Sequence, residues 1–116
     1  VLGAAGIDYM LQATADLPLG VWFGLPSCVP ATRLETAGAV LEAGDMVPYL
    51  RHPRVAALAE MMDFHGVIRE DAKVLAKIEA AREAGKRLDG HAPGLSGSML
   101  HAYLVAGRHW NRLFDI

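Results

Sequence analysis

The spacing of three short apolar segments limits the possible folds of this chain more than any other feature. The segments occupy residues 21–25, 55–59 and 87–90, so their starts lie 34 and then 32 residues apart (55 − 21 and 87 − 55). Two parallel strands joined by a crossover helix take about 30 residues or more. The spacing therefore predicts an α/β fold of repeated β-α units with parallel strands.

Helical patterns fill the intervals between these segments. A helix over residues 45–50 is expected to open on a capping Asp45, and the clearest helix covers residues 71–84 and ends before Gly85. A third covers residues 98–106. A fourth helix is expected before the first strand, and four residues share one of its faces: Ile7, Met10, Leu11 and Thr14.

Three such units have two possible arrangements. An eight-unit barrel takes about 250 residues, so a chain of 116 residues forms either a small open α/β layer or a slice of a barrel. The sequence begins with Val1 rather than Met and ends without a polar tail or capping signal. These ends favour the slice.

Composition excludes several classes of partner. The 11 basic and 13 acidic residues are spread along the chain and give a net charge of −2. The sequence has no cluster of basic residues of the kind that binds nucleic acid. No apolar run approaches the roughly 20 residues needed to cross a bilayer, and no leader peptide is visible. Cys28 is the single cysteine, which fits a reducing, cytoplasmic setting.

Candidate functional residues follow the three predicted strands. In parallel α/β folds, function gathers at the carboxyl ends of the strands, and Ser27, Glu60 and His91 stand at those ends. A carboxylate after an apolar strand is costly to bury unless it is paired or bound to metal. Neutral imidazole is a common ligand of zinc, iron and related ions.

Each candidate also has a simpler interpretation. Glu60 can be a residue at a strand end that faces water, and His91 can be a loop histidine that is hydrogen-bonded to backbone. When the two residues are considered together, a metal site is as well supported as these alternatives. Ser27 has no His/Asp pattern of a nucleophile around it, so it is either a substrate contact or part of a turn. The Gly/Ser loop over residues 94–98 can bind phosphate through backbone N–H groups or simply cap a helix.

Four blocks of sequence resemble the bacterial adenine deaminases of the amidohydrolase superfamily. They are Leu-Pro-Ser-Cys-Val-Pro-Ala-Thr at 25–32, Leu-Glu-Thr at 34–36, Leu-Ala-Glu-Met-Met at 58–62 and Asp-Gly-His-Ala-Pro-Gly-Leu-Ser-Gly at 89–97. The similarity runs in order from about Gly6 to Gly107. The motifs differ from the family pattern at Arg33, Asp63 and His65, which puts fine substrate contacts in doubt.

The resemblance implies a fold, a reaction and a cofactor. The fold is part of a distorted (β/α)8 TIM-like barrel, of which this chain would supply strands three to five. The reaction is the hydrolytic deamination of adenine to hypoxanthine and ammonia, a step of purine salvage. The cofactor is a divalent metal pair, manganese or iron, with zinc as another possibility; Glu60 would bridge the pair and His91 would be a ligand of one ion. Bound metal lowers the pKa of water.

The resemblance also indicates what this chain lacks. The His-x-His ligands would lie upstream of Val1, and an Asp-His-Glu motif is expected soon after Gly107. Residues 108–116 depart from the family abruptly, as a shifted reading frame would, so we divide the chain into a partial barrel domain at 1–107 and a divergent tail at 108–116. We therefore expect a fragment that is inactive by itself, from a parent enzyme for which a homo-oligomer is one expected state.

Two alternative functions stay open from the sequence. One is another amidohydrolase that acts on a different cyclic amide or amidine. The other is a non-catalytic α/β module that binds phosphate through the loop over residues 94–98.

Overall fold

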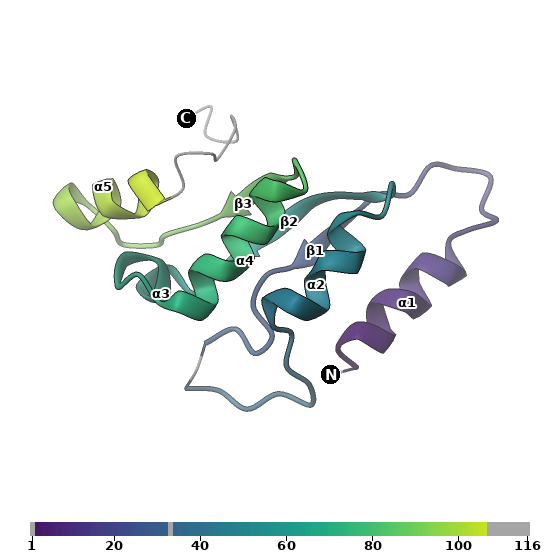
Figure 1. Ribbon diagram of the computed structural model, residues 1–116, viewed down its shortest axis with the longest axis horizontal. Coiled ribbons are helices and arrows are strands. Elements are labelled where there is room, and N and C mark those ends of the chain that lie inside the picture. Colours follow the sequence, from purple (N-terminus) through teal and green to yellow (C-terminus); the bar gives the residue numbers. More distant parts are fainter. Residues whose placement is uncertain (1, 33, 107–116) are drawn as a thin grey trace.

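A three-stranded parallel sheet forms the centre of the computed structural model, which describes residues 2–32 and 34–106 (Figure 1). The strands lie in the order β1 (Phe23–Pro26), β2 (Val55–Met61) and β3 (Arg87–Gly90), and both neighbouring pairs are parallel. Helices alternate with them along the chain. The predicted α/β class with parallel strands is confirmed, and the described sheet is open.

The strand boundaries differ from the predicted ones at two places. β1 begins at Phe23 rather than at residue 21. β2 extends two residues beyond the predicted end at residue 59, so Glu60 belongs to the strand and not to the loop after it. The extension has a physical cause, because Met61 still pairs with Gly90 of β3. The third strand, over residues 87–90, matches the prediction.

The described part of the chain contains five helices. They are α1 (Ala4–Ala13), α2 (Ala43–Leu50), α3 (Phe64–Ile68), α4 (Ala72–Glu83) and α5 (Gly97–Ala106). The prediction that Asp45 caps α2 was wrong, since Glu42 is the N-cap and Asp45 completes a reciprocal capping box with it. The short α3 was not predicted, because five residues are too few to show a helical period.

Helix α4 follows its sequence pattern closely. Asp71 is its N-cap, and the carboxylate accepts hydrogen bonds from the backbone N–H groups of Lys73 and Val74. Gly85 lies just beyond the C-cap with a φ of 65°, a left-handed conformation in which glycine carries no Cβ penalty. Local capping chemistry therefore sets both ends of this helix.

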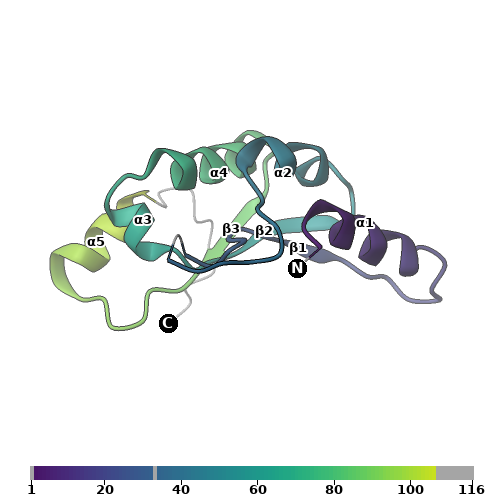
Figure 2. The same cartoon turned by 90° about the horizontal axis from the view of Figure 1, so that it is seen from below.

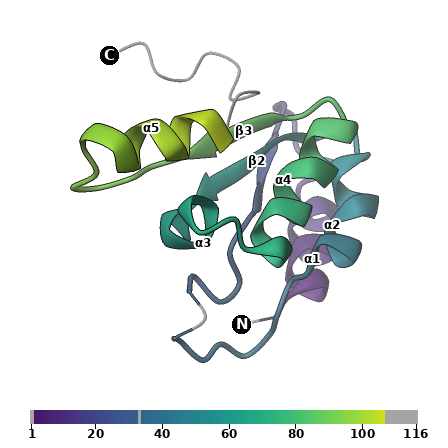
Figure 3. The same ribbon diagram turned by 60° about the vertical axis from the view of Figure 1, so that its left-hand side comes forward.

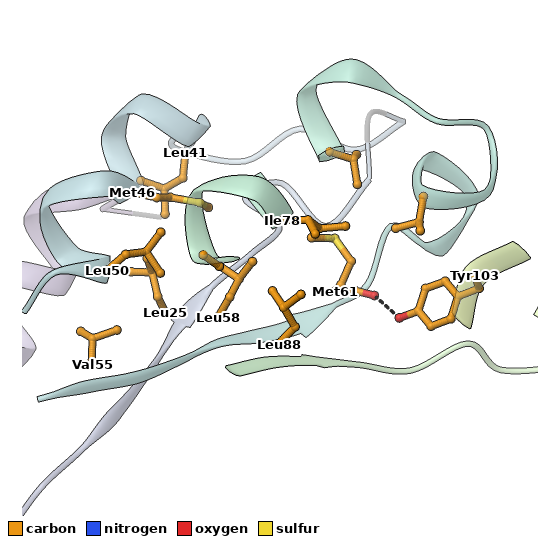
Figure 4. Close-up of a cluster of buried hydrophobic side chains, with 13 residues drawn as sticks. Leu25, Leu41, Met46, Leu50, Val55, Leu58, Met61, Ile78, Leu88 and Tyr103 are labelled. Carbon is orange, nitrogen blue, oxygen red and sulfur yellow. Dashed lines mark hydrogen bonds between the residues drawn. The ribbon is translucent and has the colours of Figure 1, made fainter. Parts of the chain in front are cut away.

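Helices α2 and α4 lie on the same side of the sheet (Figure 2). The hydrophobic core fills the space between them and the strands, and Leu25, Leu58 and Leu88 meet there because they are in register across all three strands. Figure 4 shows these leucines with Met46 and Leu50 of α2 in one cluster. This side of the sheet is therefore closed by helices.

The opposite face of the sheet carries small or polar residues. Gly24, Ala57 and Arg87 share one level across the strands, and Pro26 and Ala59 share the next. A Cβ atom at Gly24 would come within 2.8 Å of the Ala59 Cβ, so no larger side chain fits at Gly24 without movement. We refer to this surface as the open face.

Some of the predictions concern residues that the structure does not describe. The predicted tail over residues 108–116, the end of the last helix at Gly107 and the sequence difference at Arg33 lie outside the described residues. Within the described residues, no helix is both long enough and apolar enough to cross a membrane.

Candidate functional site

Glu60 and His91 meet at the carboxyl ends of neighbouring strands. The Nδ1 atom of His91 lies 2.5 Å from Oε1 of Glu60, and about half of each side chain is exposed. Glu60 is the penultimate residue of β2, and His91 directly follows β3. Parallel strands bring their carboxyl ends to one edge of the sheet, and this edge faces α3 and α5 (Figures 1 and 3). The two residues that sequence analysis selected are therefore in contact.

A bulge in β2 gives Glu60 its exposed position. Leu58 pairs with Leu88 and Met61 pairs with Gly90, so residues 59 and 60 of β2 together oppose the single residue Asp89 of β3. A regular strand alternates its faces every residue, yet Leu58 and Met61, three residues apart, are both buried in the core. The extra residue allows this burial and leaves the Glu60 side chain free to reach His91.

The backbone at the end of β3 determines the position of His91. Gly90 is the last residue of the strand and is buried, and its N–H donates to the Asp89 carboxylate at 2.8 Å. Gly94 adopts a φ of 76°, which turns the chain away from the sheet. The loop that contains His91 therefore leaves the sheet immediately beside Glu60.

Ser27 is also at this edge, but its side chain is inaccessible. It is 1% exposed, and its Oγ donates a hydrogen bond of 2.6 Å to the backbone carbonyl of Glu60. Lys77 of α4 donates from Nζ to the Ser27 carbonyl at 3.0 Å. Ser27 therefore contacts Glu60 through the backbone carbonyl of Glu60. The predicted substrate contact of Ser27 stays a prediction.

Two residues near the site were not found by sequence reasoning. Lys77 and Tyr103 lie within the helices predicted over residues 71–84 and 98–106, and nothing in the sequence pattern singled them out. Tyr103 is 1% exposed, and its hydroxyl donates to the carbonyl of Met61 at 3.5 Å. Burial raises the pKa of the Tyr103 hydroxyl well above its usual value of 10.0, and the charges of Asp89 and Cys28 raise it further. Only the tertiary contacts distinguish these residues.

Glu60 and His91 offer the right kinds of ligand atom for a divalent metal. Carboxylate oxygen and imidazole nitrogen bind manganese, iron and zinc, and both side chains are half exposed at one edge. Among residues 2–32 and 34–106, however, no group of three His, Cys, Asp or Glu side chains is placed to hold an ion. The donor chemistry fits a metal site, and the number of ligands in the described chain fits only part of one.

The glycine-rich loop after His91 has a different arrangement from the one expected. Helix α5 begins at Gly97, one residue before the predicted start at Ser98. Gly94 and Gly97 both have positive φ values, and Leu95 N–H donates to the Ala92 carbonyl within the loop. Gly94 therefore lies in a local turn, and phosphate binding by this loop stays a prediction.

Comparison with known proteins gives one consistent result. No protein-family model matches the sequence. An adenine deaminase of Desulfatibacillum aliphaticivorans is 57% identical over 107 residues, which are 92% of this chain and 19% of the relative. An adenine deaminase of Dehalococcoides mccartyi is 58% identical over 109 residues, which are 94% of this chain and 19% of the relative.

A third relative agrees with the first two. Adenine deaminase 2 of Carboxydothermus hydrogenoformans is 51% identical over 107 residues, which are 92% of this chain and 18% of the relative. The chain thus spans about a fifth of the length of the curated relatives that it matches.

Proposed function

We propose that this chain, which is homologous over nearly its whole length to a segment of the adenine deaminases, supplies one part of the active site of such an enzyme. The observation that carries the proposal is the contact between Glu60 and His91 at neighbouring strand ends, inside a sequence more than half identical to named adenine deaminases. The reaction is adenine plus water to hypoxanthine plus ammonia.

The chain contributes three consecutive β-α units, the third to the fifth, to a (β/α)8 barrel. In such a barrel the helices form the outer ring and the inner faces of the strands pack in the interior. Two observations support this arrangement: the strands are parallel, and α2 and α4 lie on the same side of the sheet.

In this proposal the partial barrel domain covers residues 1–107, and residues 108–116 form a tail that departs from the family. Sequencing the coding DNA on both sides of the segment tests this division. A frame that restores an Asp-His-Glu motif after Gly107 supports it, and an uninterrupted frame with no such motif rejects it.

In the proposed enzyme, Glu60 and His91 would hold a divalent metal pair, manganese or iron, through a carboxylate and an imidazole. When bound, such metal lowers the pKa of a coordinated water so that hydroxide is available near neutral pH. The remaining ligands come from segments of the enzyme outside the fifth that this chain matches. Ser27 stays a proposed contact to the purine.

A chimeric enzyme tests the activity directly. The matched 107 residues of the Desulfatibacillum enzyme are replaced by those of this chain, and ammonia and hypoxanthine are measured with adenine as substrate. We expect the chimera to deaminate adenine and to retain bound metal. A folded, metal-loaded chimera that is inactive on adenine but hydrolyses another cyclic amide or amidine would instead support a different amidohydrolase.

Substitutions in the chimera test the roles of the two ligands. Glu60→Ala and His91→Ala are each expected to remove bound metal and to reduce turnover by more than a hundredfold. The matched controls are Glu83→Ala and His101→Ala, which change exposed residues of the same types and should leave metal content and turnover unchanged. Full metal content in the Glu60→Ala chimera would contradict the assignment.

The isolated chain of 116 residues is expected not to deaminate adenine. The reason is that its described residues offer two of the ligands that a metal pair needs and no third side chain placed to join them. The measurement is ammonia release from adenine by the purified chain with added manganese. Catalytic release that is lost in the Glu60→Ala variant would show that the chain is sufficient by itself.

A further inference from the structure

We propose that Ser27 is a positioning residue, whose buried hydroxyl holds the β2 bulge in the conformation that presents Glu60 to His91. For its catalytic meaning this inference rests on the function proposed above. It assigns the Ser27 hydroxyl a role through the backbone carbonyl of Glu60.

Burial makes the Ser27 hydroxyl bond costly to lose. Burying a hydroxyl is unfavourable unless it has a hydrogen-bond partner, and Ser27 is 1% exposed. Its shorter hydrogen bond, of 2.6 Å, goes to the carbonyl of Glu60, 33 residues away, and the sulfur of Cys28 lies 3.3 Å from the Ser27 Oγ. The bond therefore ties the end of β1 to the very residue of β2 that carries the candidate ligand.

The neighbours of Ser27 fix the hydroxyl in turn. Lys77 of α4 donates to the Ser27 carbonyl at 3.0 Å. The thiol of Cys28 lies 3.5 Å from the Met61 sulfur, so the next residue pair along the two strands is also in contact. On the other side of the bulge, the Tyr103 hydroxyl donates to the Met61 carbonyl. Side chains from the segment after β1, from α4 and from α5 thus lie around the bulge.

The bulge needs such restraint because its alternative is a regular strand. Shifting the register by one residue turns each following side chain to the other face of the sheet. For β2 that change would turn Met61 out of the core and move Glu60 away from His91. The Ser27 bond opposes it by holding the Glu60 carbonyl, which has its fixed place only while residues 59 and 60 together face Asp89.

Nuclear magnetic resonance of the full chain tests this role without any metal. The ¹⁵N shifts of the His91 ring report its contact with Glu60, so wild-type protein and the Glu60→Ala variant define the two limits. In Ser27→Ala we expect the His91 shifts to move at least halfway to the Glu60→Ala limit. The control Ser98→Ala removes an exposed hydroxyl on α5 and should give wild-type shifts. Wild-type His91 shifts in folded Ser27→Ala would overturn the inference.

A second variant decides the matter if Ser27→Ala does not fold. Ser27→Cys keeps a weak donor of similar size, and an intermediate displacement of the His91 shifts is expected. Unchanged shifts would reject the positioning role. If both variants unfold, Ser27 is required for folding and the specific role is likewise rejected.

Manganese affinity separates this inference from the proposed function. Partners that orient metal ligands typically change metal affinity by about 10- to 100-fold when they are lost, so we expect about tenfold weaker manganese binding in the chimera with Ser27→Ala than in the unsubstituted chimera. An unsubstituted chimera that binds no manganese contradicts the metal site but leaves the His91 shifts to decide the role of Ser27. Equal affinity in both proteins, with unchanged shifts, overturns the inference.

Discussion

At the scale of single residues, Glu60 shows how a backbone irregularity determines the position of a functional side chain. Its sequence context, a carboxylate after five apolar residues, indicated that it must be either solvated or paired. In the structure it is both, half exposed and 2.5 Å from His91. The carboxylate therefore avoids the cost of burial while staying at the strand end.

Tyr103 provides a prediction about pH at this scale. Its pKa is raised above 10.0 in the folded state, first by burial and then by the charges of Asp89 and Cys28. The unfolded chain therefore loses this proton at a lower pH than the folded chain does, and stability falls as pH rises above about 10. We expect the free-energy difference between wild type and Tyr103→Phe to shift in favour of the variant over that range, as urea denaturation at several pH values measures.

An exposed tyrosine is the control for this experiment. Tyr9 of α1 is 66% exposed, and Tyr9→Phe should give a stability profile parallel to that of the wild type at every pH. If Tyr103→Phe gives an equally parallel profile, burial does not perturb the Tyr103 hydroxyl and the prediction fails.

At the scale of elements, the central strand β2 contributes both to the core and to the candidate site. It is the central strand and pairs with both β1 and β3. Its register shifts at both neighbours place Val55, Leu58 and Met61 in the core at intervals of three residues. Each shift adds a residue relative to the neighbouring strand, and the second shift presents Glu60. The same irregularity therefore serves core packing and the candidate site.

Leu58 is expected to contribute more to stability than any exposed leucine. It is 0% exposed and lies between Leu25 and Leu88 across the sheet. Leu58→Ala should cost about 2 to 5 kcal/mol of unfolding free energy, because it removes buried methyl groups and leaves a cavity. Leu34→Ala is the matched control, since Leu34 is 98% exposed and its change should be near zero. Urea denaturation of both variants measures the difference, and equal costs would refute the packing argument.

Helix α1 is held by an interaction that no local pattern indicates. The guanidinium group of Arg54, just before β2, donates to the hydroxyl of Thr14 at 2.8 Å and to the carbonyls of Leu11 and Thr14. A cation at the carboxyl end of a helix is favourable because the last carbonyls lack partners within the helix. The contact joins positions 40 residues apart along the chain (54 − 14).

At the scale of the whole molecule, the chain exposes much apolar surface. Leu2, Tyr9, Leu19 and Trp22 are each more than 60% exposed. An apolar groove of about 460 Å³ lies between α1 and β1. β1 and β3 form the two edges of the described sheet, and unpaired edges with apolar surroundings favour association. These properties are those expected of a chain whose apolar surface and sheet edges pack against other segments, as proposed above.

The isolated chain is therefore expected to melt over a broad temperature range and to associate. Far-ultraviolet circular dichroism during heating, sedimentation, and binding of the dye ANS, which reports exposed apolar surface, measure these properties. A sharp two-state transition of a monomer that binds no ANS would argue that the chain is a self-contained open layer rather than part of a barrel.

The sequence by itself determined the β-α periodicity, the ends of α4 and the residue types at the strand ends. These follow from local chemistry: apolar runs set the strands, and Asp71 and Gly85 set the helix boundaries through capping and a positive φ. Similarity to a known family extended this to Glu60 and His91. The extension of β2, the short α3 and the role of Glu42 as N-cap were known only from the structure. Each depends on strand pairing or helix capping, and this sequence offers more than one residue at which either could occur.

Only the tertiary structure decided how Glu60 reaches His91. The contact depends on the bulge at residues 59 and 60, and on Ser27 and Tyr103, which approach the β2 backbone from 33 and 42 residues away along the chain. A bulge is the outcome of competition between strand pairing and core packing across the whole sheet. That competition involves residues far apart in sequence, so its outcome cannot be predicted from a local sequence pattern.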